Sequence, residues 1–274
     1  MATYNVHFGV KNAQPPGSMT FFLDDEKFTQ KMMLDFFKSQ KPFEPKLSEF
    51  LANFLSPGDV FVDIGGHIGY FSMVASLMVG SDGKVVTFEP EWSNYQHILK
   101  HIEMNRLTNV VPLPWAVNAK TGVVQLFISG NDGGHAIWDL RTGPYEAGVA
   151  DMKQKPAFGV ALDDVRYLFP KPPRMIKIDV EGVEVEVLRG AVGLLAEKNV
   201  SFVICECHRA YLHRMGQSEQ SLRKFMTDLG YEVFADAGED SALIPLPAGA
   251  SLNTNMIFNL IFALPNAMKP SSKN

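Results

Sequence analysis

The stretch from Val60 to Ser72 restricts the fold of this chain more than any other part of the sequence. It begins with the apolar, β-branched run Val60–Ile64, which is typical of a parallel strand covered on both faces. Glycines follow, and the apolar run from Ile68 to Val79 predicts a helix. Because a helix N-terminus carries partial positive charge, this strand–turn–helix unit predicts an α/β domain whose turn holds a ligand.

The spacing of the glycines indicates which ligand. A dinucleotide-binding turn has the pattern G-x-G-x-x-G, and with Gly65 first, its second and third glycines would fall on His67 and Tyr70. The pattern here is D-x-G-x-x-x-G, and Asp63 would repel a pyrophosphate but pair with the ammonium of an amino-acid moiety. This favours S-adenosylmethionine (SAM) over a nicotinamide cofactor; the alternative is a plain turn with a buried aspartate that caps the helix. The expected cofactor contacts in the turn are Asp63, Gly65, Gly66 and Gly69.

The next predicted strand, Lys84 to Glu89, ends on an acid. Glu89 lies 24 positions after Gly65 (89 − 65), close to the ~20 at which related folds place an acid on ribose hydroxyls. Further on, we expect Ala116 to lie where the chain passes the adenine, although its neighbour Trp115 is equally consistent with a core residue.

Two later apolar strands also run into acids. The first is followed by Asp179 and Glu181, and the second by Glu206 and His208. Because ligands of open α/β sheets bind outside the carboxyl ends of the strands, we expect these four side chains to share one cleft as catalytic residues. Asp179 and Glu206 are also candidates to hold a hard cation such as Mg²⁺. The alternative is that each acid caps a helix or pairs with a neighbouring Lys or Arg.

Residues 129–158 show neither helical nor strand periodicity. Long loops of this kind in compact domains are often lids or binding loops, so we expect a substrate-facing loop with His135, Trp138 and Arg141 as substrate contacts. The alternative is a surface excursion without a role in binding.

Composition restricts the partners and the compartment. A net charge of −5 disfavours nucleic acid, and the run Met256–Leu264 is too short to span a bilayer. No signal peptide is evident at the N-terminus. Cys205 and Cys207 are too close along one strand for an ordinary disulfide, which suits a reducing compartment. We therefore expect a cytoplasmic protein without a membrane span.

The segment from Lys177 to Ala191, K-I-D-V-E-G-V-E-V-E-V-L-R-G-A, resembles the FkbM family of SAM-dependent methyltransferases, which characteristically show K-I-D-V-E-G-x-E-x-x-V-L-x-G-A. The resemblance spans about Leu51 to Phe262. Gly66 departs from it, because an alanine is more usual there. The other matching segments are Val62–Ser72, Phe88–Pro90, Leu162–Asp164, Gly230–Tyr231 and Asn255.

The resemblance implies a Rossmann-like, seven-stranded α/β sheet, mostly parallel with an antiparallel edge pair and with helices on both faces. It implies SAM contacts at Asp63, Gly65, Gly69 and Glu89, and it supports a substrate or catalytic role for Asp179 and Glu181. It also implies O-methylation of a hydroxyl of a sugar, glycan or natural product; the alternative is a non-catalytic SAM-binding protein. The acceptor, the base, metal dependence and the oligomeric state stay open.

The expected domain organisation has three parts. Residues 1–40 form an accessory segment with one helix, residues 41–265 form the methyltransferase domain, and residues 266–274 form a frayed tail.

Overall fold

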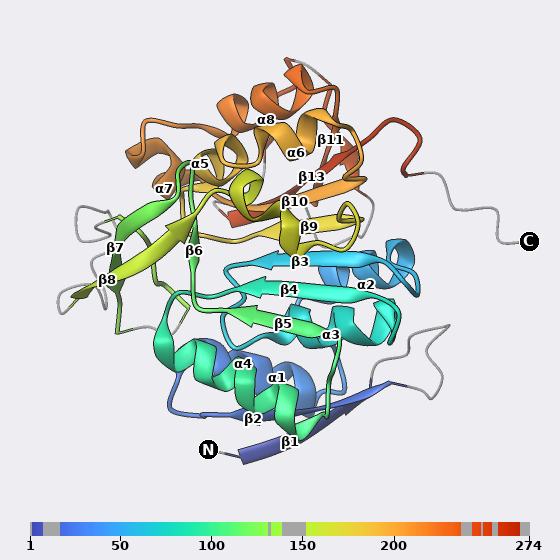
Figure 1. The fold of residues 1–274 in the computed structure, drawn as a ribbon, viewed down its shortest axis with the longest axis vertical. Coiled ribbons are helices and arrows are strands. Elements are labelled where there is room, and N and C mark those ends of the chain that lie inside the picture. The colour runs from blue at the N-terminus through green and yellow to red at the C-terminus, as the bar shows by residue number, and fades with distance from the viewer. Residues whose placement is uncertain are drawn as a thin grey trace, which may run out of the picture.

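A computed structural model describes residues 2–7, 17–130, 133–138, 152–236, 243–247, 249–253 and 257–268 (Figure 1). Within these residues the main sheet has eight strands in the order β12-β11-β13-β10-β9-β3-β4-β5. Its strands are β3 (Val60–Ile64), β4 (Lys84–Phe88), β5 (Val110–Leu113), β9 (Met175–Ile178), β10 (Phe202–His208), β11 (Glu232–Asp236), β12 (Ile244–Pro245) and β13 (Ile257–Ala263).

The predicted α/β class is confirmed. Strands β10, β9, β3, β4 and β5 pair in parallel, while β13 runs antiparallel between β10 and β11. The sheet exceeds the expected seven strands because Ile244–Pro245 pairs with β11 as a two-residue edge strand, β12. Such a short strand has no periodicity from which it could be predicted.

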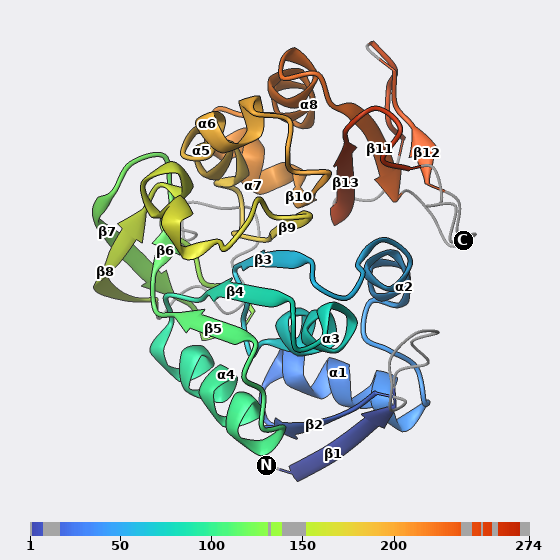
Figure 2. The same cartoon turned by 45° about the vertical axis from the view of Figure 1, so that its right-hand side comes forward.

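Helices cover both faces of the sheet, as Figure 2 shows. The helices are α1 (Phe28–Lys38), α2 (Pro45–Phe54), α3 (Tyr70–Val79), α4 (Trp92–Met104), α5 (Glu184–Arg189), α6 (Val192–Ala196), α7 (Arg209–Arg214) and α8 (Glu219–Asp228), with a 3-10 helix, η2 (Leu162–Leu168). Alternate residues of each strand enter different cores: Phe61 lies in a core with the buried residues of α1 to α4, whereas Val62 lies in one with those of α5, α6 and α8. This alternation explains why every residue of β3 is buried.

The segment before α2 contains a hairpin as well as the helix expected for it. Strands β1 (Ala2–His7) and β2 (Ser18–Leu23) form an antiparallel hairpin, and Met19, Phe21 and Leu23 are buried in the same core as Phe61. That residues 1–40 are an accessory unit stays a prediction. Residues 269–274 of the predicted tail lie outside the described residues.

His101 of α4 joins the hairpin to the glycine turn. Its Nδ1 lies 2.8 Å from the carbonyl oxygen of Ile68, and the Phe22 N–H donates to its Nε2 at 3.0 Å. The neutral ring with its proton on Nδ1 satisfies both of these contacts, whereas the Phe22 carbonyl oxygen, 3.1 Å from Nε2, would be satisfied only by a proton on Nε2. Complete burial disfavours the charged ring and lowers the pKa of His101 to about 4.

We expect this histidine to make stability depend on pH. The unfolded chain binds a proton at His101 near pH 6.5 and the folded chain only near pH 4, so stability falls as the pH drops through that window, by up to about 3 kcal/mol. Urea unfolding at several pH values measures the slope. A His101→Gln variant should show a flatter slope, and the exposed control His213→Gln should retain the wild-type slope. An unchanged slope in His101→Gln would contradict this assignment.

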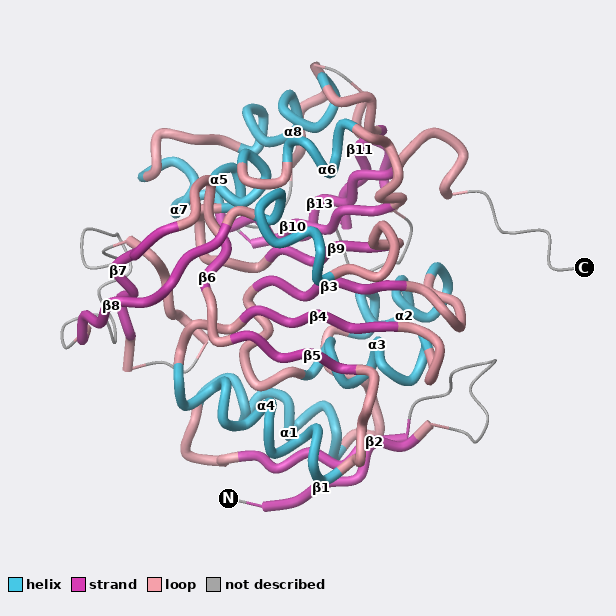
Figure 3. Tube along the Cα trace, viewed as in Figure 1, coloured by secondary structure: helices cyan, strands magenta, loops and turns pink. Residues whose placement is uncertain are grey.

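A second sheet lies beside the carboxyl ends of the main sheet (Figure 3). It consists of β6 (Ala116–Val117), β8 (Lys153–Val160) and β7 (Gly122–Ile128) in that order. The expectation of an irregular loop through residue 158 is therefore wrong at its C-terminal end, where β8 pairs with β7. Most of β8 is exposed on both faces, so it lacks an apolar alternation.

Two smaller expectations concern the membrane and the cysteines. In the described part of the chain, every helix is too short or too polar to cross a bilayer. Cys205 and Cys207 are both free and buried, as expected for core residues.

Candidate active site

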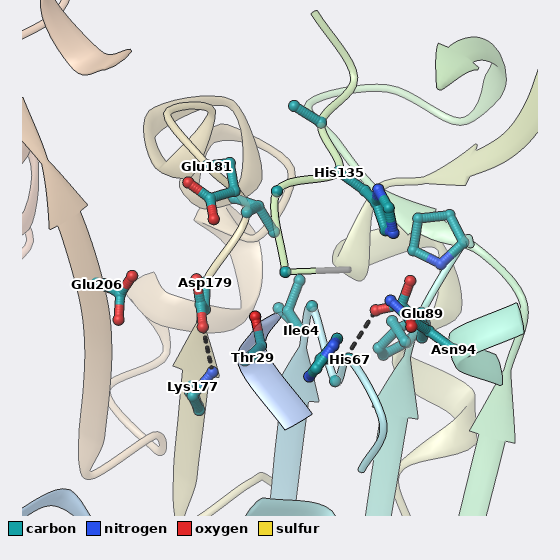
Figure 4. Close-up of a pocket in the computed structure, with 18 of the residues that line it drawn as sticks. Thr29, Ile64, His67, Glu89, Asn94, His135, Lys177, Asp179, Glu181 and Glu206 are labelled. Carbon is teal, nitrogen blue, oxygen red and sulfur yellow. Dashed lines mark hydrogen bonds and ion pairs between the residues drawn. The ribbon is translucent and has the colours of Figure 1, made fainter. Parts of the chain in front are cut away.

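A cavity of about 370 Å³ opens at the carboxyl ends of β3, β4, β9 and β10. Figure 4 shows side chains from these strand ends pointing into one space, with Glu89 and His67 on one side and Asp179 and Glu206 on the other. The strand order therefore brings together the two sequence segments in which we predict chemistry, although Glu89 and Asp179 are 90 positions apart (179 − 89).

The glycine turn forms the floor of this cavity. Gly65 has a φ of +77°, and a Cβ there would lie 1.8 Å from the backbone oxygen of Asp179, so the ends of β3 and β9 touch only because position 65 lacks a side chain. Gly65 and Gly66 line the cavity, while Gly69, with a φ of +88°, begins α3. A Cβ at Gly66 would lie 2.3 Å from Thr87 Oγ1, which explains the absence of the more usual alanine.

Asp63 lies beneath the turn. Its side chain is buried, its Oδ2 accepts a 2.6 Å hydrogen bond from Ser72 of α3, and it is absent from the cavity lining. The expected direct pairing of Asp63 with an ammonium therefore finds no support in this geometry, because β3 directs this residue towards α3. Burial raises the pKa of Asp63. Its role in SAM binding stays a prediction, and it would act through the turn above it.

Glu89 lies at the carboxyl end of β4 and faces the cavity. Its two carboxylate oxygens accept hydrogen bonds from the backbone N–H groups of His67, at 2.8 Å, and Glu91, at 2.9 Å. Burial raises its pKa to about 8. Each oxygen retains a lone pair that can accept a hydrogen bond from a hydroxyl. Ala116 of β6 lines the cavity too, beside Trp115.

We use the term acidic cluster for Asp179, Glu181 and Glu206, which line the cavity around Lys177. The Lys177 Nζ lies 2.9 Å from Asp179 Oδ2, and Lys177 is also the direct neighbour of Asp63 across β3 and β9. Burial, together with the charge of Asp179, raises the pKa of Glu181. The charge of Asp179, together with burial, raises that of Glu206. Both groups are therefore stronger bases than an exposed glutamate.

His208 ends β10 and also lines the cavity. Its ring stacks on Tyr211 of α7, with a centroid distance of 3.7 Å and an interplanar angle of 11°. Burial lowers the pKa of His208, which favours the neutral imidazole. The cavity thus holds all four predicted catalytic residues, and their individual roles stay predictions.

The predicted substrate contacts are found in different places. His135 lines the cavity. Trp138 is buried, and its Nε1 donates a 2.6 Å hydrogen bond to the backbone oxygen of Glu181, so it supports the left-handed turn at Glu181 (φ 57°) from behind. It does not line the cavity. Arg141 lies outside the described residues.

Sequence reasoning missed the residues that α1 and the start of α2 add to the cavity. Phe28 and Met32 of α1 contribute an apolar part of the lining, Thr29 adds a hydroxyl group, and Glu44 adds a carboxyl group. All precede the motifs, and the helical spacing of Phe28 and Met32 predicts residues that pack on the core. In the structure, α1 differs from an ordinary packed helix because some of its apolar side chains are exposed, such as Phe28 at 66% exposure.

The Mg²⁺ expectation lacks a geometric basis in the described part of the chain. No group of three or more His, Cys, Asp and Glu side chains there has an arrangement that could hold a metal ion. Asp179 and Glu206 line the same cavity, but Asp179 is occupied by Lys177. The metal stays a prediction that chelation with EDTA can test.

The residues present fit SAM. The glycine turn, the buried acid at the end of β4 and the acidic lining suit a ligand with ribose hydroxyls and positive charge. The fold and the site thus define the class as an α/β SAM-dependent methyltransferase. A family model described as "Methyltransferase FkbM domain" matches residues 63–233. The chain belongs to the FkbM methyltransferase family.

Individual relatives are more distant. The hexuronic acid methyltransferase AglP of Haloferax volcanii is 28% identical over 152 residues, which cover 55% of this chain and 56% of that protein. The matched part thus spans about half the length of that curated relative. The structure of methyltransferase FkbM from Methylobacillus flagellatus KT has a TM-score of 0.48 at 13% identity, covering 86% of this chain and 53% of that one. The precorrin-6y C5,15-methyltransferase of Geobacter metallireducens GS-15 has a TM-score of 0.44 at 13% identity, covering 89% and 93%.

Proposed function

We propose that this protein transfers a methyl group from SAM to a hydroxyl of a sugar, a glycan or a natural-product small molecule. The observation that carries the proposal is the shared cavity, in which the glycine turn and Glu89 face the acidic cluster. A cofactor held on one side would present its reactive group to an acceptor on the other. The name of the Haloferax volcanii relative supports a sugar-type acceptor.

Some residues of this chain would bind the cofactor, and others would accept the proton of the acceptor hydroxyl. When bound, SAM supplies a methyl group activated by a positively charged sulfur. Glu89 accepts hydrogen bonds from hydroxyls, and the backbone of the glycine turn allows close approach. A carboxylate of the acidic cluster, or His208, takes the acceptor's hydroxyl proton as its oxygen bonds to the methyl carbon and the carbon–sulfur bond breaks. Raised carboxyl pKa values at Glu181 and Glu206 suit this role near neutral pH.

Two measurements test the proposal. Isothermal titration should detect SAM binding to the folded protein, and S-adenosylhomocysteine (SAH) should accumulate when SAM is supplied with a panel of sugars and hydroxylated natural products. Glu206→Gln should reduce turnover by about 100-fold or more if Glu206 is the base, with little change in SAM affinity. A folded protein that does not bind SAM would end the proposal, while SAM binding without SAH formation from any acceptor would favour a non-catalytic SAM-binding protein.

A further inference from the structure

Glu44 has an unusual place at the start of α2. It is the residue immediately before the helix and has a φ of 43°, a left-handed conformation that costs a non-glycine residue about 1–2 kcal/mol. Its side chain does not cap the helix. Asn, Asp or Ser would be the ordinary choice at this position, both for capping and, with Asn, for tolerance of the left-handed region. The fold therefore retains a residue that is poor for local stability.

The side chain of Glu44 lines the cavity instead. Among the described residues it makes no side-chain hydrogen bond, and its carboxyl interacts with the charges of Lys177 in β9 and of Asp179, which follows that strand. Burial raises the pKa of Glu44 to about 7. A positive charge in the cavity would therefore favour its ionised form. The residue lies outside the matched family range of 63–233, so the family motifs do not point to it.

The described lining of the cavity has more carboxyl groups than basic side chains. Lys177 is its one lysine or arginine, and its ammonium is already paired with Asp179. The lining carboxyl groups are Glu44, Glu89, Asp179, Glu181 and Glu206. SAM and SAH differ by one methyl group and by one unit of positive charge at sulfur, which makes them a matched pair of probes for this excess.

We propose that Glu44 is a specificity-determining residue that favours the positively charged SAM over the neutral product SAH. The inference rests on the proposed function, because it requires SAM to bind in this cavity. Its consequence is that the loss of the methyl group also removes the positive charge that Glu44 attracts, so release of the product becomes easier.

The experiment compares dissociation constants of SAM and SAH, measured by titration calorimetry near pH 8 without any acceptor. In Glu44→Gln, SAM should bind about 3–10-fold more weakly while SAH affinity changes little. Glu44→Asn should lose the same preference but unfold at a higher temperature than the wild type, because Asn relieves the backbone strain and can cap α2. Glu49→Gln, an exposed position on the same helix, is the matched control and should leave both constants unchanged.

The outcomes separate this inference from the function on which it rests. Equal weakening of SAM and SAH in Glu44→Gln, or no change in either, would overturn the charge-recognition role while leaving the proposed function intact. A Glu44→Asn variant that is less stable than the wild type would show that the left-handed glutamate serves the fold, and would also overturn it. Failure of the wild-type protein to bind either compound would overturn the proposed function itself.

Discussion

Gly65→Ala should be the most damaging single-methyl change in the chain. The added Cβ would lie 1.8 Å from the backbone oxygen of Asp179 and 2.9 Å from its carbonyl carbon. Backbone atoms at the end of a central strand cannot move aside as a flexible side chain can. We expect a loss of more than about 4 kcal/mol in the free energy of unfolding, with a separation of β3 from β9 that also disrupts the cavity floor.

Gly58→Ala is the control that isolates this effect. Gly58 has a similar φ of +85°, but a Cβ there would have no heavy atom within 4 Å. It should therefore show only the backbone cost of a left-handed alanine, about 1–2 kcal/mol. Thermal unfolding followed by circular dichroism compares the stability of the two variants. Titration of any folded Gly65→Ala protein with SAM measures how far the change in the glycine turn lowers SAM affinity. Equal destabilisation by the two substitutions would show that the contact between Gly65 and Asp179 is unimportant.

Lys177→Met should be the second largest change. Lys177 is 4% exposed and lies beside the buried Asp63 and the partly exposed Asp179, so its removal leaves these two carboxyl groups without their nearest positive charge. Breaking a buried ion pair from one side costs about 3–5 kcal/mol. We expect this loss near pH 8, and a clearly smaller loss near pH 5.5.

The pH dependence follows from the carboxyl groups around Lys177. The pKa values of Glu181 and Glu206 are raised well above the ordinary value, and that of Glu44 to about 7. These groups take up protons as the pH falls, so less uncompensated charge remains in the variant at pH 5.5. Urea unfolding at both pH values measures the difference. Lys224→Met breaks an exposed pair with Asp228 and should cost less than about 1 kcal/mol at either pH. A Lys177→Met loss that grows towards acidic pH would contradict this account.

The parts of the site that could be predicted from the sequence are those on buried strands. An apolar run that ends in an acid predicts both the strand and the sheet edge at which the acid lies, and Glu89, Asp179 and Glu206 do line the cavity at that edge. The side chain of Asp63 is harder to place, because a buried strand has two covered faces and the pattern does not indicate which of them meets a ligand. Only the structure shows that Asp63 faces Ser72 of α3.

Other parts carried no usable signal. Strand β8 is mostly exposed and contains Pro156, so the alternation that identifies a strand is missing. The glycine-rich loop predicts a substrate contact at Trp138, and no local pattern predicts the hydrogen bond from its indole to the backbone of Glu181, 43 positions away. Glu44 itself has a left-handed backbone conformation, and no sequence pattern predicts such a conformation for a glutamate.

The position of β13 has a consequence for where this protein can be cut. The family range ends at residue 233, but β13, at residues 257–263, fills the place between β10 and β11. A fragment limited to residues 63–233 would lack its central antiparallel strand, and the bare backbone of β10 would be open to pairing with other chains. The segment that identifies the family is therefore shorter than the segment needed for folding. Expression of residues 63–233 alone should give aggregated protein.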